Sequence, residues 1–196
     1  MNRAAELRQE IREAWSHMVP PVLPPPLRED WIEYPDTYRA VNGTSWESIN
    51  LGPSGDLHEQ WNDCWIESVR PRHARVYYYA VFLDYFVKYY EEYQRDTELQ
   101  EFPDGDIPFM CAVCFTAERL LDDGDWKAMT RRQLRVTLAV LEFARAHWPA
   151  YGFPDEAARD DDGREFNRKL RQSLESSIVR VRRLLLRDRA ESTLAE

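Results

Sequence analysis

Residues 69–96 read VRPRHARVYYYAVFLDYFVKYYEEYQRD, and this stretch decides the fold class. Ser68 or Val69 precedes a predicted helix, and Pro71 suits its first turn, where no backbone donor is needed. From Val76 to Tyr90, apolar and aromatic residues cover most of the helix circumference, which is typical of a helix surrounded by others. The polar side chains form one narrow stripe: His73, Tyr77, Asp84, Lys88, Glu91 and Arg95. We therefore expect residues 70–95 to be the buried, Tyr-rich core helix of a bundle.

The segments on both sides of this helix repeat apolar residues at helical spacing, and no useful strand-like alternation occurs. Residues 2–18 predict an amphipathic first helix, and the six prolines of residues 20–35 predict an extended arm over the surface. Further helices are expected over 106–123, 130–148 and about 164–190. The sequence thus predicts one all-α domain over residues 1–196, an irregular bundle of about five helices with a Pro-rich N-terminal arm.

Two of the predicted helices begin with recognisable N-cap signals. Thr130 and Gln133 match the T-x-x-Q capping box, in which side chain and backbone exchange hydrogen bonds. In the turn-rich stretch 41–56, Thr44 or Ser45 is suited to cap a short helix that carries Trp46. We expect both signals to mark real helix starts.

Composition excludes several classes of protein. The 196 residues are 43% hydrophobic, and seven Trp, ten Tyr and eight Phe are too many aromatic residues for a disordered chain. The net charge of −9 disfavours a globally basic nucleic-acid binder and favours a basic partner. No window approaches the length of a membrane span, and the first residues do not resemble a secretory signal. Three cysteines suit a reducing compartment, so we expect a cytoplasmic protein.

Charge is nevertheless distributed unevenly. Residues 164–190 hold nine basic and three acidic side chains, a net charge of +6, whereas the remainder of the chain carries −15. A basic helix that docks partly on an acidic body explains this pattern most simply.

The motifs that suggest catalysis or metal binding are incomplete. Cys111 and Cys114 lie inside an apolar helical run, where core packing explains them better than redox chemistry. His58 lacks the second histidine of a metalloprotease helix. The clusters at 122–125 and 160–162 suit loops and helix caps better than magnesium. We assign no catalytic residue, no metal and no cofactor.

The start of the core helix offers a candidate small-ligand site. The cluster Arg70, Arg72, His73 and Arg75, with Tyr77 and Tyr78, falls where a helix N-terminus favours an anion. The alternative is that these arginines pair with carboxylates of the acidic body, and we favour that interpretation.

Three features resemble a family of uncharacterised bacterial proteins known only as a domain of unknown function. They are Trp46 in SWESI, the PRHARVYYYAVFLDYF helix and the capped TRRQLRVTLAVLEF helix, which together lie within residues 41–148. The resemblance implies an all-α fold. It implies no catalytic residues.

Three functions of different classes fit these observations. We favour an acidic protein that binds another protein, such as an immunity or inhibitor protein against a basic bacterial toxin. The first alternative is an enzyme or ligand-binding bundle with a closed pocket along the polar stripe of 70–95. The second is a regulatory or assembly module in which Leu184 to Leu186 meet a second subunit, as in a homodimer. The candidate binding residues are Trp46, Arg72, His73, Tyr77, Asp84 and Lys88.

Overall fold

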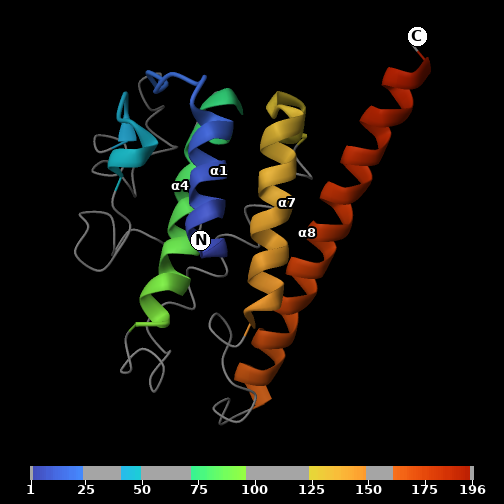
Figure 1. The fold of residues 1–196 in the computed structure, drawn as a ribbon. Helices are drawn as coiled ribbons and strands as arrows, with labels where there is room; N and C mark the ends of the chain where they lie inside the picture. The colour runs from blue at the N-terminus through green and yellow to red at the C-terminus, as the bar shows by residue number, and fades with distance from the viewer. Residues whose placement is uncertain (1, 24–40, 50–71, 96–123, 149–160, 195–196) are drawn as a thin grey trace, which may run out of the picture.

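The computed structural model describes residues 2–23, 41–49, 72–95, 124–148 and 161–194, and this part of the chain is all-helical, as predicted. It contains four α-helices and two 3-10 turns and no strand (Figure 1). The elements are α1 (Arg3–Trp15), η1 (Trp46–Ser48), α4 (Arg72–Tyr93), η4 (Asp125–Ala128), α7 (Arg131–Ala146) and α8 (Asp161–Leu194).

Helix α1 lies between α4 and α7 and packs against both (Figure 1). Asn2 caps its N-terminus, since the side-chain oxygen accepts a hydrogen bond from the Ala4 N–H at 3.3 Å. Its buried residues recur at helical spacing: Ala4, Leu7, Ile11, Ala14 and Trp15. At the end of this face, the Trp15 indole N–H donates to the Val76 carbonyl of α4 at 2.8 Å. The predicted amphipathic first helix is confirmed.

Helix α4 is buried on nearly all sides over its first half. Every residue from Ala74 to Leu83 is buried, and α1, η1 and η4 pack against the helix. The polar stripe is shorter than expected, because Tyr77 is only 2% exposed and belongs to the buried face. A tyrosine can lie inside when its hydroxyl finds a hydrogen-bond partner, as this one does. Asp84, Lys88 and Glu91 are half-buried.

Helices α7 and α8 form an antiparallel pair on the other side of α1 (Figure 1). The predicted capping box of α7 is present: Thr130 Oγ1 accepts from the Gln133 N–H at 3.2 Å, and Gln133 Oε1 accepts from the Thr130 N–H at 2.8 Å. The face of α8 toward α7 contributes buried residues at spacings of three and four: Leu170, Leu174, Ile178 and Val181. Helix α8 begins at Asp161 and ends at Leu194, so it is longer than the predicted 164–190.

Several predictions lie outside the described residues. These are most of the Pro-rich arm, the helix over 106–123, the three cysteines and His58. The expected total of about five helices therefore stays a prediction. No described helix has the length and apolar character that crossing a bilayer requires.

Candidate functional site

The structure divides the six candidate binding residues into two groups along α4. Arg72 and His73 lie at its first turn, beside η4. The other four lie around the η1 turn: Trp46, Tyr77, Asp84 and Lys88.

The arginines at the start of α4 pair with a carboxylate of the protein itself. Arg75 binds Asp125 through two hydrogen bonds, one of them from Nη2 to Oδ1 at 2.8 Å. Arg72 Nε lies 3.2 Å from the same Oδ1, and the Asp125 side chain is 1% exposed. These two arginines therefore pair with a carboxylate of the protein, as the alternative to an anion site predicts. His73 is exposed.

Asp125 has a different role from the one that its sequence suggested. It belongs to the acidic cluster 122–125, which we interpreted as a loop or cap, but its carboxylate links η4 to α4. Gly124, with φ of 74°, is the residue that caps η4. Among the described residues, no group of His, Cys, Asp and Glu side chains could hold a metal ion.

Two tyrosines of α4 hold the segment that carries Trp46. The Tyr77 hydroxyl accepts a hydrogen bond from the Trp46 N–H at 3.2 Å, and the Tyr78 hydroxyl donates to the Val41 carbonyl. Burial raises the pKa of Tyr78 and keeps its hydroxyl protonated as a donor. Ser45 precedes η1 as expected, but its side chain forms no capping bond, and the helix is a single 3-10 turn.

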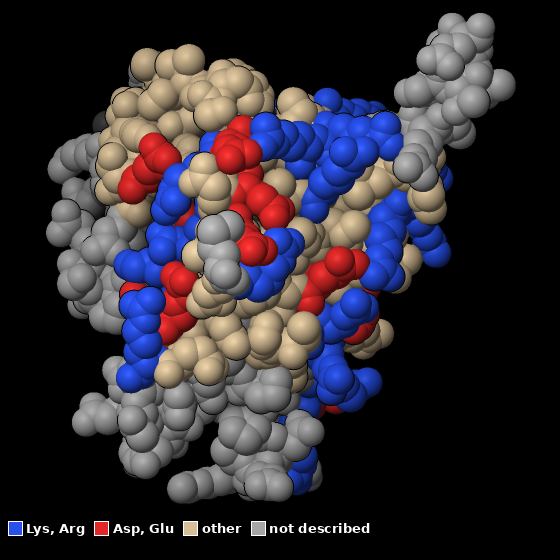
Figure 2. Space-filling view, viewed as in Figure 1, with Lys and Arg blue, Asp and Glu red and all other residues tan. Residues whose placement is uncertain are grey.

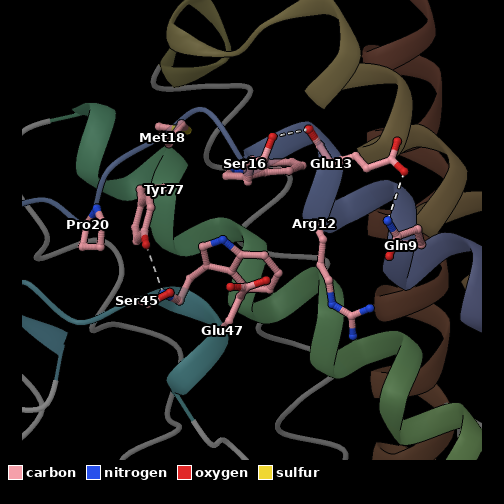
Figure 3. Close-up of a pocket in the computed structure, with 11 residues that line it drawn as sticks. Gln9, Arg12, Glu13, Ser16, Met18, Pro20, Ser45, Glu47 and Tyr77 are labelled. Carbon is pink, nitrogen blue, oxygen red and sulfur yellow. Dashed lines mark hydrogen bonds between the residues drawn. The ribbon is translucent and has the colours of Figure 1, made fainter.

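A cleft of about 380 Å³ lies between this turn and α1, and we call it the Trp46 cleft (Figure 3). Its floor consists of buried aromatic side chains: Trp15, Trp46 and Tyr77. Its rim is polar and mostly exposed: Gln9, Arg12, Glu13, Ser16, Ser45 and Glu47. Met18 and Pro20 close the end toward the chain that follows α1.

The charged residues of the rim differ in whether they have a partner within the protein. The Glu13 carboxylate accepts from Gln9 Nε2 at 3.0 Å and also binds Arg132 of α7. These two hydrogen bonds lower the pKa of Glu13. Arg12 and Glu47 form no ion pair with any described residue, although they lie on two sides of the same cleft (Figure 3). The rim therefore presents one cation and one anion that no described residue pairs with.

A smaller cavity of about 190 Å³ lies on the other side of the Trp46–Glu47 turn. Asp84 and Lys88 line it, but both are engaged within the protein. Arg8 Nε binds Asp84 at 3.0 Å, and Lys88 Nζ lies 3.4 Å from Glu92. Of these two hollows, the larger is the cleft centred on Trp46, and the closed pocket that we expected along the polar stripe stays a prediction.

Sequence reasoning found part of this site and missed the rest. The sequence predicts Trp46 and Tyr77 as binding residues but does not indicate Arg12, Trp15 or Glu47. Glu47 follows Trp46 directly, so that neighbour could have been inferred. Arg12 and Trp15 come from α1, and no local signal indicated that α1 lies beside residues 45–47.

The C-terminal leucines also differ from one another. Leu184 and Leu185 are half-buried and pack against the core, but Leu186 is 63% exposed. Arg182 and Arg183 are exposed.

Comparison with known proteins yields no relative: the chain matches no protein-family model, no curated protein and no solved structure. The resemblance to an uncharacterised bacterial family therefore stays a prediction.

Proposed function

We propose that this chain is a small cytoplasmic protein that binds another protein, as an immunity or inhibitor protein binds a basic bacterial toxin. The observation that carries this proposal is the Trp46 cleft, which combines an aromatic floor with a cation and an anion that have no described partner. Interfaces concentrate their binding energy in such places, where aromatic and arginine side chains lie near a rigid pocket. The net charge of −9 favours a basic partner.

The floor of the cleft is organised before a partner arrives. The Trp15 indole is fixed by its hydrogen bond to α4, and the backbone of Trp46 is held by the Tyr77 hydroxyl, while both tryptophan side chains are buried. A partner would therefore order few side chains on this surface, and less free energy would be lost on binding.

The rim indicates which groups of a partner fit best. A Lys or Arg side chain of the partner can place its alkyl part against the floor and its charged head near Glu47. A carboxylate of the same partner can meet Arg12. Two opposite charges at a fixed spacing orient the partner as well as attract it.

The size of the cleft supports one alternative, a small-ligand-binding function. A volume of about 380 Å³ lies within the range of roughly 300–1,000 Å³ that is common for ligand pockets. A ligand with both charge signs would meet the same two side chains.

We also propose that residues 1–196 form an irregular bundle of about five helices around α4. The burial of every residue from Ala74 to Leu83 supports this arrangement, because a helix buried on all sides needs neighbours on all sides.

The test uses the full chain as bait in lysate of the native host. We expect one stoichiometric, salt-sensitive protein partner, which Glu47→Arg loses and the control Glu165→Arg keeps. Both substitutions reverse one negative charge, but Glu165, whose side chain is 44% exposed, lies on α8, outside the cleft. A partner that both variants keep would contradict a role for the cleft. If no protein binds but a small molecule raises the melting temperature of the wild type and not of Glu47→Arg, the alternative function is supported.

A further inference from the structure

The outer face of α8 near its C-terminus combines exposed apolar side chains with unpaired positive charge. Val179 is 41% exposed and Leu186 is 63% exposed, and each is a large hydrophobic residue on the solvent side of the helix. They are seven residues apart, which is two helical turns or about 10.5 Å. Arg183 lies between them on the same face. We call these three residues, with the neighbouring Arg187, the α8 stripe.

The stripe is not needed for packing within the described fold. The opposite face of α8 provides the residues that pack on α7: Leu174, Ile178 and Val181. Toward its C-terminus, α8 diverges from α7 (Figure 1). The four stripe residues are all exposed. Val179 and Leu186 are two of the four large hydrophobic residues that are exposed in the described part of the chain.

The charge of this region has one sign. Residues 179–187 contain four arginines and no acidic residue. Arg182 is paired with Glu142 of α7, with Nε 3.2 Å from the carboxylate, but Arg183 and Arg187 have no carboxylate partner among the described residues. Figure 2 shows Lys and Arg side chains gathered over α7 and α8 on this face of the molecule. The surface is thus basic on a protein whose net charge is −9.

We propose that the α8 stripe docks an amphipathic, acidic α-helix of another protein. Val179 and Leu186 occupy the same heptad position, and the alkyl part of Arg183 between them can complete the apolar seam that helix-on-helix packing uses, while flanking charges select the partner helix. Here the flanking charges are positive, so the partner must supply Glu or Asp beside its own apolar seam. This surface is distinct from the Trp46 cleft, and the proposal does not depend on the function proposed for that cleft.

Other occupants fit the stripe less well. A second copy that packed the same face would bring Arg183 and Arg187 of one molecule against those of the other, which like charges oppose. Phosphate groups of nucleic acid gain nothing from Val179 and Leu186. A membrane surface requires a broad apolar face, and two side chains two turns apart are too few.

The test is fluorescence anisotropy with two labelled synthetic helices of about four heptads, each with Leu at positions a and d. One peptide carries Glu at positions e and g, and the other carries Lys there. We expect the full chain to bind the Glu peptide at micromolar concentrations, more weakly at high salt, and not to bind the Lys peptide. Leu186→Glu and Arg183→Glu should each weaken binding about tenfold or more.

Arg171→Glu is the matched control, because it makes the same charge reversal at an exposed position of α8 outside the stripe. It should change the affinity less than about twofold. Circular dichroism of each variant confirms that α8 is intact. Several results would overturn the proposal: no binding of the Glu peptide at roughly 100 µM, equal binding of both peptides, or equal loss in the control. Tighter binding to a duplex DNA or to phosphatidylserine vesicles, or a dimer that Leu186→Glu abolishes, would also overturn it.

Discussion

The ion pair between Arg75 and Asp125 gives the sharpest prediction about stability. It joins two elements that are 50 residues apart in sequence, α4 and η4, and both side chains are buried, at 10% and 1% exposed. The Arg72 guanidinium reaches the same carboxylate from the surface, with its side chain 61% exposed. Asp125→Ala would remove the carboxylate that accepts two hydrogen bonds from the buried Arg75 guanidinium.

The expected cost follows from that burial. Removing one member of a buried pair typically costs about 3–5 kcal/mol, because the remaining charge stays in a poorly solvated place. A domain of this kind has about 5–15 kcal/mol of total stability, so the loss is a large fraction of it. Urea unfolding, followed by circular dichroism, should show a midpoint lowered by at least about 1 M at an unchanged slope.

Two further variants separate the buried pair from its surroundings. Arg72→Ala should cost no more than about 1 kcal/mol, because exposed ion pairs contribute little. The double variant Arg75→Met with Asp125→Leu should recover most of the loss, since two apolar side chains leave no buried charge. If Asp125→Ala costs less than about 1 kcal/mol, or if the double variant is as unstable as the sum of its single changes, the reasoning is refuted.

Three other predictions follow from single contacts. Tyr78→Phe should destabilise the fold by about 1–3 kcal/mol in urea unfolding, because the Val41 carbonyl loses its buried donor; no change would contradict that bond. Thr130→Ala should cost about 1 kcal/mol through loss of the α7 cap, and Thr130→Ser should cost less. Burial lowers the pKa of His147 below its ordinary value of 6.5, so the unfolded chain binds the proton more readily. Stability should therefore decrease as the pH falls below about 6.5 and level off below the folded-state pKa. His147→Phe should remove this pH-dependent loss of stability. If the variant loses stability with pH as the wild type does, the prediction is wrong.

Local patterns were sufficient to predict the helices. The burial of Leu134, Leu141 and Trp148 follows the apolar spacing of the α7 segment, and the Thr130–Gln133 capping box is present as expected. The first depends on residues seven apart, or two helical turns, and the second on residues three apart, and a helix determines these relative positions by itself. The all-helical class of the described chain could therefore be predicted from the sequence.

The candidate site could be predicted only in part. Trp46 and Tyr77 were recognised as candidates, but their direct hydrogen bond was not, because they are separated by 31 residues. Asp84 and Lys88 were recognised as polar, yet the sequence could not show that Arg8 and Glu92 already engage them. The sequence shows that a residue is polar and on which side of a helix it lies, but not which distant group it binds.

By itself, the sequence determined where the four α-helices of the described chain lie and which side of α1, α7 and α8 is apolar. Helical periodicity and capping act over one or two turns, so neighbouring residues contain all of that information. Only the tertiary structure decided that Tyr77 is buried, that Arg75 meets Asp125, and that α1 and η1 enclose a cleft. Each of these depends on how whole elements pack, and that packing brings together groups that are far apart along the chain.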